Sequence, residues 1–242
     1  SDGFTVGQGT SNGAAMNDSG DSHVSLNWKA NGAGSANTDG SINSTVSVNT
    51  TAGFSIVKYV GTGSSSNSTV GHGLGVKPAM IIVKNLGSAG NWVVWHQKLT
   101  SETDSYLRLD TDAVPGSTTN YWNSAAPTNQ VFGVSVDGYN NNKSGENIIA
   151  YCFAEKTGYS KFGSYVGNSS NDGTFVYTGF KPAFLMVKPV GSTADNWVMF
   201  DDARLGYNPD NNFVYANKYF ADNNADIIDL LSNGFKMKSS GN

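Results

Sequence analysis

Cysteine, charged residues and long apolar runs are all scarce in this sequence of 242 residues. The single cysteine, Cys152, excludes a disulfide within the chain, and its apolar neighbours at 148–153 predict a buried small side chain. Charged residues make up 14%, against about 25% in an average soluble domain. No stretch approaches the ~20 apolar residues of a membrane span, and no run of Lys or Arg marks a nucleic-acid surface. We therefore expect neither membrane insertion nor nucleic-acid binding.

Residue patterns that support catalysis are equally scarce. The three histidines, His23, His72 and His96, stand at no metal-ligand spacing. The glycine-rich surroundings of His72 precede an expected strand rather than a helix, so they predict a turn and not a phosphate loop. No GxSxG elbow is present. We expect a protein that is not an enzyme and needs no cofactor.

Acidic pairs offer one weak metal candidate. Asp110 and Asp112 are separated by one residue in a polar stretch, and carboxylate oxygens suit Ca²⁺. The spacing matches no EF-hand, and the pair does not recur elsewhere in the chain. A solvated or turn-capping role is the stronger interpretation of these carboxylates.

Small polar residues supply most of the polarity. Asn, Ser, Thr and Gly are abundant, with 29 glycines, and aromatics reach 12%. Asn and Gly favour turns, whereas aromatic and β-branched residues favour strands. The composition therefore predicts many short strands joined by turns, and it suits a surface outside a cell or on a virion.

An internal repeat organises the chain. Residues 76–84 read VKPAMIIVK, and residues 180–188 read FKPAFLMVK, 104 positions later. Further landmarks recur at nearly the same offset: YVG at 59–61 and 165–167, NWV at 91–93 and 196–198, and the Gly/Phe segments 131–134 and 234–237. A repeat of about 104 residues follows.

The N-terminal residues resemble the end of such a repeat. Residues 18–28, DSG followed by HVSLNW, resemble residues 143–153, where KSG precedes IIAYCF. The last copy ends before an equivalent of this segment. We divide the chain into a completing strand pair at 1–30, a linker at 31–52, a complete repeat at 53–156, and a second repeat at 157–242 that lacks its last strand.

Apolar patterning predicts an all-β fold of antiparallel strands, with the repeats as tandem β-sandwiches of jelly-roll or lectin-like form. One short helix is expected at 223–231. Strands are expected at 54–59, 79–84, 92–96, 106–109, 131–136, 148–154, 161–166, 183–188, 197–200, 213–215 and 234–238, and the alternation at 45–49 is compatible with a short strand within the linker.

Aromatic residues provide the candidate ligand-binding positions. Trp92 and Trp197 occupy the same place in the two repeats, which favours a structural role. Unrepeated aromatics in Asn-rich loops can stack on sugar rings, although packing at the end of a sandwich is the stronger alternative. These candidates are Tyr121, Trp122, Tyr139 and Tyr207.

The motif string resembles a known repeat domain. The string comprises GFSIV at 53–57, residues 70–75 and 77–84, Asn91-Trp92, and AYCFAE at 150–155 followed by GYSKFG at 158–163. It is similar to an uncharacterised repeat of phage proteins, often from marine and cyanobacterial viruses, that are labelled tail-fibre or virion-appendage proteins. The resemblance implies a structural or host-attachment role on a virion, with a host-surface glycan or protein as partner. It implies no catalytic residue.

The two chain ends are complementary under this division. Val24, Leu26 and Trp28 alternate as in a strand, and the last repeat leaves a sheet edge open. Three alternatives follow: an internal clasp, head-to-tail donation to a second copy that builds a filament, or a fragment of a longer array. A carbohydrate-binding module of a secreted protein is a further alternative.

Overall fold

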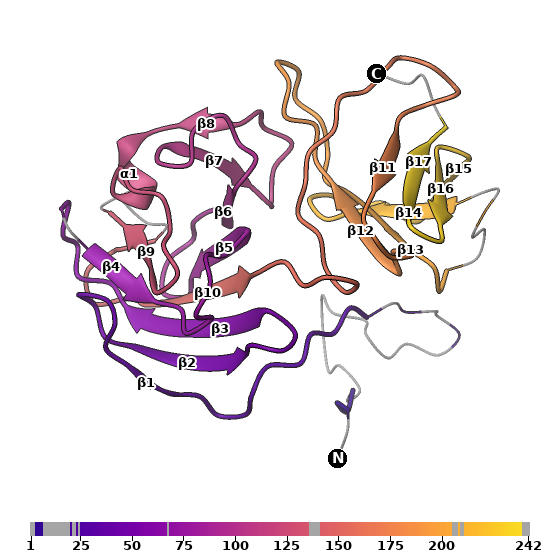
Figure 1. The fold of residues 1–242 in the computed structure, drawn as a ribbon. Helices are drawn as coiled ribbons and strands as arrows, with labels where there is room; N and C mark the ends of the chain where they lie inside the picture. The colour runs from indigo at the N-terminus through magenta and orange to yellow at the C-terminus, as the bar shows by residue number, and fades with distance from the viewer. Residues whose placement is uncertain are drawn as a thin grey trace.

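The fold is built almost wholly of antiparallel strands, as the patterning predicts. A computed structural model describes residues 3–6, 20, 23, 25–66, 68–135, 141–204, 208 and 211–238. Within these residues lie seventeen strands and one short helix, and every strand pair is antiparallel. Figure 1 shows two groups of strands, one from each half of the chain. We call them the first unit, residues 35–153, and the second unit, residues 161–238.

An eight-stranded sheet forms one layer of the first unit. Its strands, in spatial order, are β1 (Ser35–Asn37), β2 (Ser44–Asn49), β3 (Phe54–Val60), β10 (Asn147–Phe153), β5 (Met80–Asn85), β6 (Val93–His96), β7 (Ser105–Arg108) and β8 (Gly116–Ser117). β10 lies between β3 and β5 and pairs with both along its length. Its side chains alternate, with Ile148, Ala150 and Cys152 fully buried and those between them half-buried.

A smaller layer closes the core of the first unit. It consists of β4 (Ser68–Gly71), β9 (Val131–Val134) and the helix α1 (Thr119–Trp122). Val70, Phe132 and Trp122 from this layer pack with the inward residues of the large sheet in one core. Because period-two alternation sends every second residue to one face, the other face of the large sheet remains available for packing.

The second unit also has two layers, a sheet of four strands and a sheet of three. One sheet contains β12 (Phe184–Val187), β13 (Val198–Asp201), β14 (Asn211–Tyr215) and β15 (Asn223–Ala225). The facing sheet contains β11 (Phe175–Tyr177), β17 (Gly234–Met237) and β16 (Ile228–Leu231). Its core consists of Phe200, Phe213, Ile228, Leu230 and Phe235.

Strand pairing in the two units follows the same register. Ile81 pairs with Trp95 in the first unit, and Leu185 pairs with Phe200 in the second. Three more pairings correspond at offsets of 103–107 residues: Val93↔Arg108 with Val198↔Tyr215, Tyr106↔Gly116 with Phe213↔Asn223, and Val70↔Phe132 with Val176↔Phe235. Corresponding sequence segments therefore take corresponding places in their sheets.

Side-chain packing follows the same correspondence. Tyr59 meets Phe132 edge-on, with ring centroids 6.3 Å apart, and Tyr165 meets Phe235 edge-on at 5.8 Å. The ring of Tyr165 thus meets the facing sheet of its unit as the ring of Tyr59 in β3 does, and residues 161–166 surround it. They form no strand with any described residue, which corrects the strand expected there. β3 is held by β2 and β10, whereas the second unit has no described strand at the place of β10.

Two further expectations are wrong. Residues 31–52 are not a linker, because β1 and β2 lie within them and extend the large sheet. Residues 223–231 form no helix but the strands β15 and β16. In β16, Ile228 and Leu230 are buried while their neighbours are half-buried, so the apolar run follows a strand period of two.

The two units pack through the outer faces of their larger sheets. Met80, Val94 and Leu107 of the first unit form one cluster with Trp197, and Met186 packs against it. The indole Nε1 of Trp197 also donates to the carbonyl of Arg108, at 2.8 Å. We call this contact the seam. It makes Trp197 a structural residue.

Candidate functional site

Two of the aromatic candidates for ligand binding are buried. Tyr121 and Trp122 are 3% and 1% exposed, and the indole of Trp122 donates to the carbonyl of Ser105 at 3.0 Å. The ring of Tyr121 meets Tyr106 at 4.4 Å. Because α1 belongs to the smaller layer that closes the core, the rings of Tyr121 and Trp122 fill that core. Their proposed role as a sugar platform is therefore wrong, and packing at the end of the sandwich explains them.

The remaining candidates divide by what the structure describes. Tyr139, Tyr207 and Val24 lie outside the described residues. Leu26 and Trp28 are 37% and 42% exposed and belong to no strand. The ring of Trp28 nevertheless meets Phe153 of the first unit and Phe184 of the second, with centroids 6.0 and 5.8 Å apart.

Asp110 and Asp112 are engaged by cationic and N–H groups. The Asp112 carboxylate is 3.1 Å from the ammonium of Lys218 and its carbonyl accepts from Lys188. The hydrogen bond from Lys218 holds the pKa of Asp112 below its usual value. Among the described residues, no group of three His, Cys, Asp or Glu side chains is placed to hold a metal. The pair thus stays a weak calcium candidate, and Asp112 contacts Lys188 and Lys218 of the second unit.

Buried titratable groups have structural partners. The ring of His72 is fully buried, with Nδ1 accepting from the amide of Leu74 and Nε2 3.2 Å from the carbonyl of Thr128. Burial lowers the pKa of His72. Burial also raises the pKa of Cys152 to about 12, so this thiol stays protonated. Both groups are thus buried side chains of the first unit.

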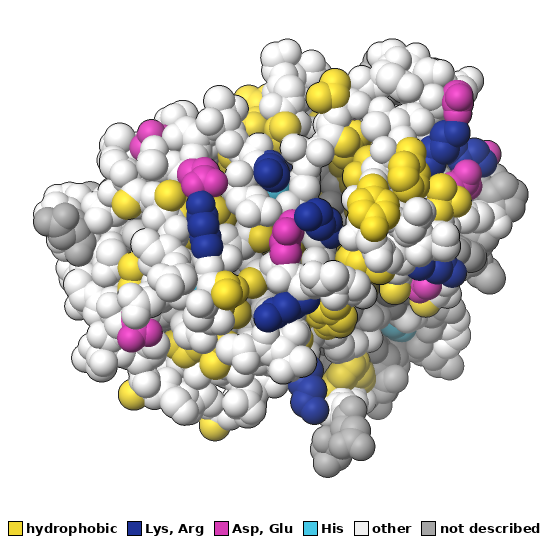
Figure 2. All heavy atoms as spheres, in the orientation of Figure 1, with side chains coloured by type: hydrophobic (Ala, Val, Ile, Leu, Met, Phe, Trp, Pro, Cys, Tyr) yellow, Lys and Arg dark blue, Asp and Glu magenta, His cyan; other side chains and the backbone are white. Residues whose placement is uncertain are grey.

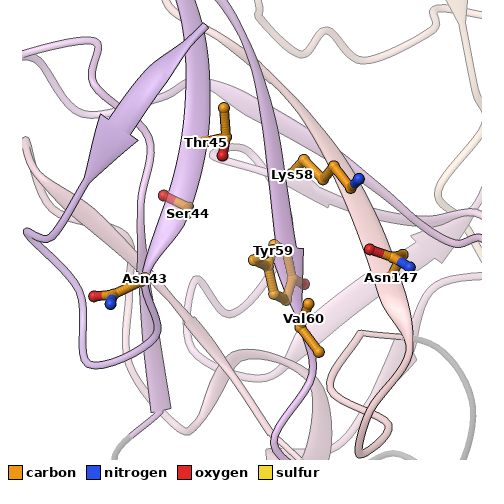
Figure 3. A pocket seen from close by; sticks show the side chains of 7 residues that line it. All are labelled: Asn43, Ser44, Thr45, Lys58, Tyr59, Val60 and Asn147. Carbon is orange, nitrogen blue, oxygen red and sulfur yellow. The ribbon is translucent and has the colours of Figure 1, made fainter.

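One hollow lies at the end of the large sheet of the first unit. Figure 3 shows residues of β2, β3 and β10 around it. Its lining residues are Asn43, Ser44, Thr45, Lys58, Tyr59, Val60 and Asn147. The ring of Tyr59 is 2% exposed, and its hydroxyl donates to the carbonyl of Asn141 at 2.6 Å. This hollow therefore presents polar groups without an exposed aromatic face.

A second hollow lies at the seam and is the stronger candidate. It is lined by Trp92, Leu109, Asp110 and Ala216, the last of these from the second unit. Trp92 is half-buried, and its ring lies nearly parallel to that of Tyr151, with centroids 6.5 Å apart and planes 15° apart. The hollow thus combines a flat aromatic group, apolar walls and a carboxylate.

Polar side chains hold the rim of this hollow in place. Asp110 Oδ1 accepts from the backbone amide of Trp92 at 3.1 Å. The side chain of Asn91 donates to Asp110 Oδ2 and accepts from Arg108 Nε, both at 3.2 Å, when its amide nitrogen faces the carboxylate. Such planar polar groups beside an aromatic ring suit the hydroxyls and C–H faces of a sugar.

Sequence reasoning did not single out Trp92 as a ligand-binding residue, because it shares its repeat position with Trp197. Its counterpart Trp197 is 4% exposed and packs within the seam, whereas Trp92 lines the open hollow beside it. Asp110 corresponds to Asn217, which accepts from the amide of Trp197 in the same way. One sequence difference between the two sites is this exchange of a carboxylate for an amide.

Exposed aromatics also occur on the second unit. Phe175 and Tyr177 of β11 are 44% and 66% exposed. Figure 2 shows hydrophobic side chains gathered where Figure 1 places β11. No helix in the described part of the chain is long and apolar enough to cross a membrane.

Comparison with known proteins places the chain in a family. A family model described as a domain of unknown function, DUF7483, matches residues 1–242. The chain belongs to this family. No curated protein and no solved structure matches it. Membership in DUF7483 thus carries no activity, and the function must be argued from the residues.

Proposed function

We propose that this DUF7483 chain is a non-enzymatic structural and attachment component of a phage fibre or other virion appendage. It acts on the virion or otherwise outside cells, where it contacts a host surface and associates with further copies. Its architecture under this proposal is a tandem array of β-sandwich units of about 104 residues. The resemblance of the motif string to phage repeat domains suggests the virion.

The shared register of the two units carries this proposal. Corresponding pairs such as Ile81↔Trp95 and Leu185↔Phe200 support one unit used twice. A chain of such units buries a continuous core, and repetition is a common way to build extended binding and structural proteins. The buried positions of His72 and Cys152 support the non-enzymatic part, because neither side chain faces a cleft.

Electron microscopy with light scattering tests the structural role. We expect the purified chain to form dimers or longer particles as its concentration rises, with a spacing that matches the long dimension of one chain. A particle that stays monomeric at every concentration and binds no host cells would contradict the proposal. If a monomer bound host cells, the attachment role would stand and the self-association role would be refuted.

A carbohydrate-binding role is a second candidate, and the seam hollow favours it. A sugar ring stacks its C–H face on an aromatic plane, while planar polar side chains take its hydroxyls. Base stacking on aromatic rings is worth about 1–3 kcal/mol, and we take sugar stacking to be of similar order. Trp92 supplies the plane, and Asp110 supplies a carboxylate.

A glycan array, followed by titration of any hit, tests this role. Trp92→Ala should abolish binding of the hit, and Trp92→Phe should retain part of it. Tyr177→Ala, which removes an exposed aromatic far along the sequence, is the matched control and should bind as the parent does. Equal binding by the parent and Trp92→Ala would refute a sugar site in the seam hollow.

A further inference from the structure

The larger sheet of the second unit has room for one more strand. In the first unit, β10 fills the space between β3 and β5 and pairs with both. In the second unit the two walls are present: Tyr165 marks the place of β3, and β12 takes the place of β5. No described strand lies between them.

The inward side chains of β12 are less buried than those of β5, as expected for a strand with an unpaired edge. Ile81 and Val83 of β5 point to the core and are 0% exposed. Their counterparts Leu185 and Val187 in β12 are only half-buried. An unpaired edge beside half-buried apolar side chains is the feature to which an added strand binds.

The N-terminal segment already touches this edge. Trp28 corresponds to Phe153 in the motif, and Phe153 pairs with Met80 at the start of β5. The counterpart of Met80 is Phe184, and the ring of Trp28 lies 5.8 Å from it. The ring of Trp28 therefore contacts the residue of β12 that corresponds to the partner of Phe153, although residues 25–28 make no ladder with β12 in the structure.

Two hydrogen bonds tether the residues next to Trp28. The carbonyl of Lys29 accepts from the side chain of Asn49, and the amide of Asn31 donates to Ser47, both in β2. A tether this short gives the segment a high effective concentration at the edge of its own chain. A strand from a second copy would compete against that advantage.

We propose that residues 25–28 form the missing strand within the same chain, antiparallel to β12, with Trp28 opposite Phe184 and Ser25 opposite Val187. The proposal rests on the repeat architecture proposed above. Leu26 and Trp28 then continue the apolar seam. In this strand Ser25 and Asn27, which are exposed in the structure, turn inward to the places that the small residues Ala150 and Cys152 take in the first unit. The Asn27 side chain already donates to Ser25 at 3.0 Å, as expected for neighbours on one strand face.

Paired cysteines test the register in the full chain. Ser25→Cys with Val187→Cys places the two sulfurs on facing residues, within disulfide reach. Ser25→Cys with Leu185→Cys is the matched mismatch, on the same face but one pair further along. Cys152 does not compete, because its thiol is fully buried and its pKa is raised to about 12. We expect the first pair to oxidise within the monomer several-fold more than the second.

Other results would overturn the proposal in recognisable ways. Equal yields from both pairs would deny the register. A disulfide between chains would assign the edge to a second copy and make the chain a filament subunit by strand donation. The pair Met186→Cys and Met199→Cys, already opposite each other in β12 and β13, tests the repeat register itself. If that pair oxidises and Ser25 with Val187 does not, only the strand proposal fails.

Hydrogen exchange supplies a second measurement. The bonds from the Leu86 N–H to the Asn147 carbonyl and from the Ala154 N–H to the Gly53 carbonyl show that alternate residues of β10 face β5 and β3, with Tyr151 facing β5. Leu26 takes the place of Tyr151, so Leu26→Pro removes an N–H that faces β12 and should lower amide protection along β12. Leu26→Ala removes the same side chain and keeps the N–H, and it should leave that protection within a few-fold of the parent. Unchanged protection in Leu26→Pro would overturn the proposal.

Discussion

Removing the indole of Trp197 should destabilise the whole chain, because this side chain joins the two units. It is 4% exposed and packs against Met80, Val94, Leu99 and Leu107. Replacing a buried aromatic by alanine costs about 3–5 kcal/mol, of which the hydrogen bond to the Arg108 carbonyl contributes about 1. For a chain of this size, that loss corresponds to a fall in Tm of about 6–20 °C.

Chemical denaturation followed by tryptophan fluorescence and circular dichroism measures the effect. Trp197→Ala should lower the free energy of unfolding and separate the transitions of the two units, since the seam couples them. Trp197→Phe keeps most of the packing and loses the hydrogen bond, so it should cost much less. Trp92→Ala is the control, because its half-buried ring borders a hollow. If Trp92→Ala were as costly as Trp197→Ala, the assignment of the seam would be refuted.

Three further predictions concern the first unit. Burial lowers the pKa of His72, so as the pH falls this ring is protonated in the unfolded chain before it is protonated in the folded one. The free energy of unfolding should therefore be retained above pH ~6.5 and decline as pH falls below it. His72→Gln should flatten that decline in urea titrations. The Cys152 thiol should resist a thiol reagent until the protein unfolds, and rapid labelling of the folded protein would contradict its burial. A Cβ at Gly133 would lie 2.2 Å from the carbonyl oxygen of Trp122, so Gly133→Ala should cost about 1–3 kcal/mol. Gly163→Ala, which meets nothing within 4 Å, should change stability by less than about 0.5 kcal/mol, and equal losses in the two alanine variants would refute the packing argument.

Local pattern was sufficient for most strands. The alternation in 148–154 and the apolar run in 79–84 correspond to β10 (Asn147–Phe153) and β5 (Met80–Asn85), to within one residue at each end. The motif offset of about 104 residues likewise matches the common pairing register of the two units. Strand alternation depends on neighbours within a few residues, and the repeat is found by comparing the sequence with itself.

The burial of particular side chains could not be predicted from local sequence. Tyr121 and Trp122 stand among Asn and Thr residues, yet α1 turns both rings into the core. Trp92 and Trp197 have nearly identical local sequences, yet one borders a hollow and the other fills the seam. The difference arises because each unit meets a different part of the other, which no window of sequence contains.

The sequence by itself determined the all-β class, the positions of most of the expected strands and the motif repeat, because these follow from side-chain periodicity and turn residues. Tertiary structure alone decided that the segment 31–52 extends the large sheet instead of linking two parts of the chain, and that 223–231 are strands. It also decided that 161–166 lack a strand. In each case the outcome depends on whether another strand is present to pair the backbone, and that partner lies up to a hundred residues away along the chain.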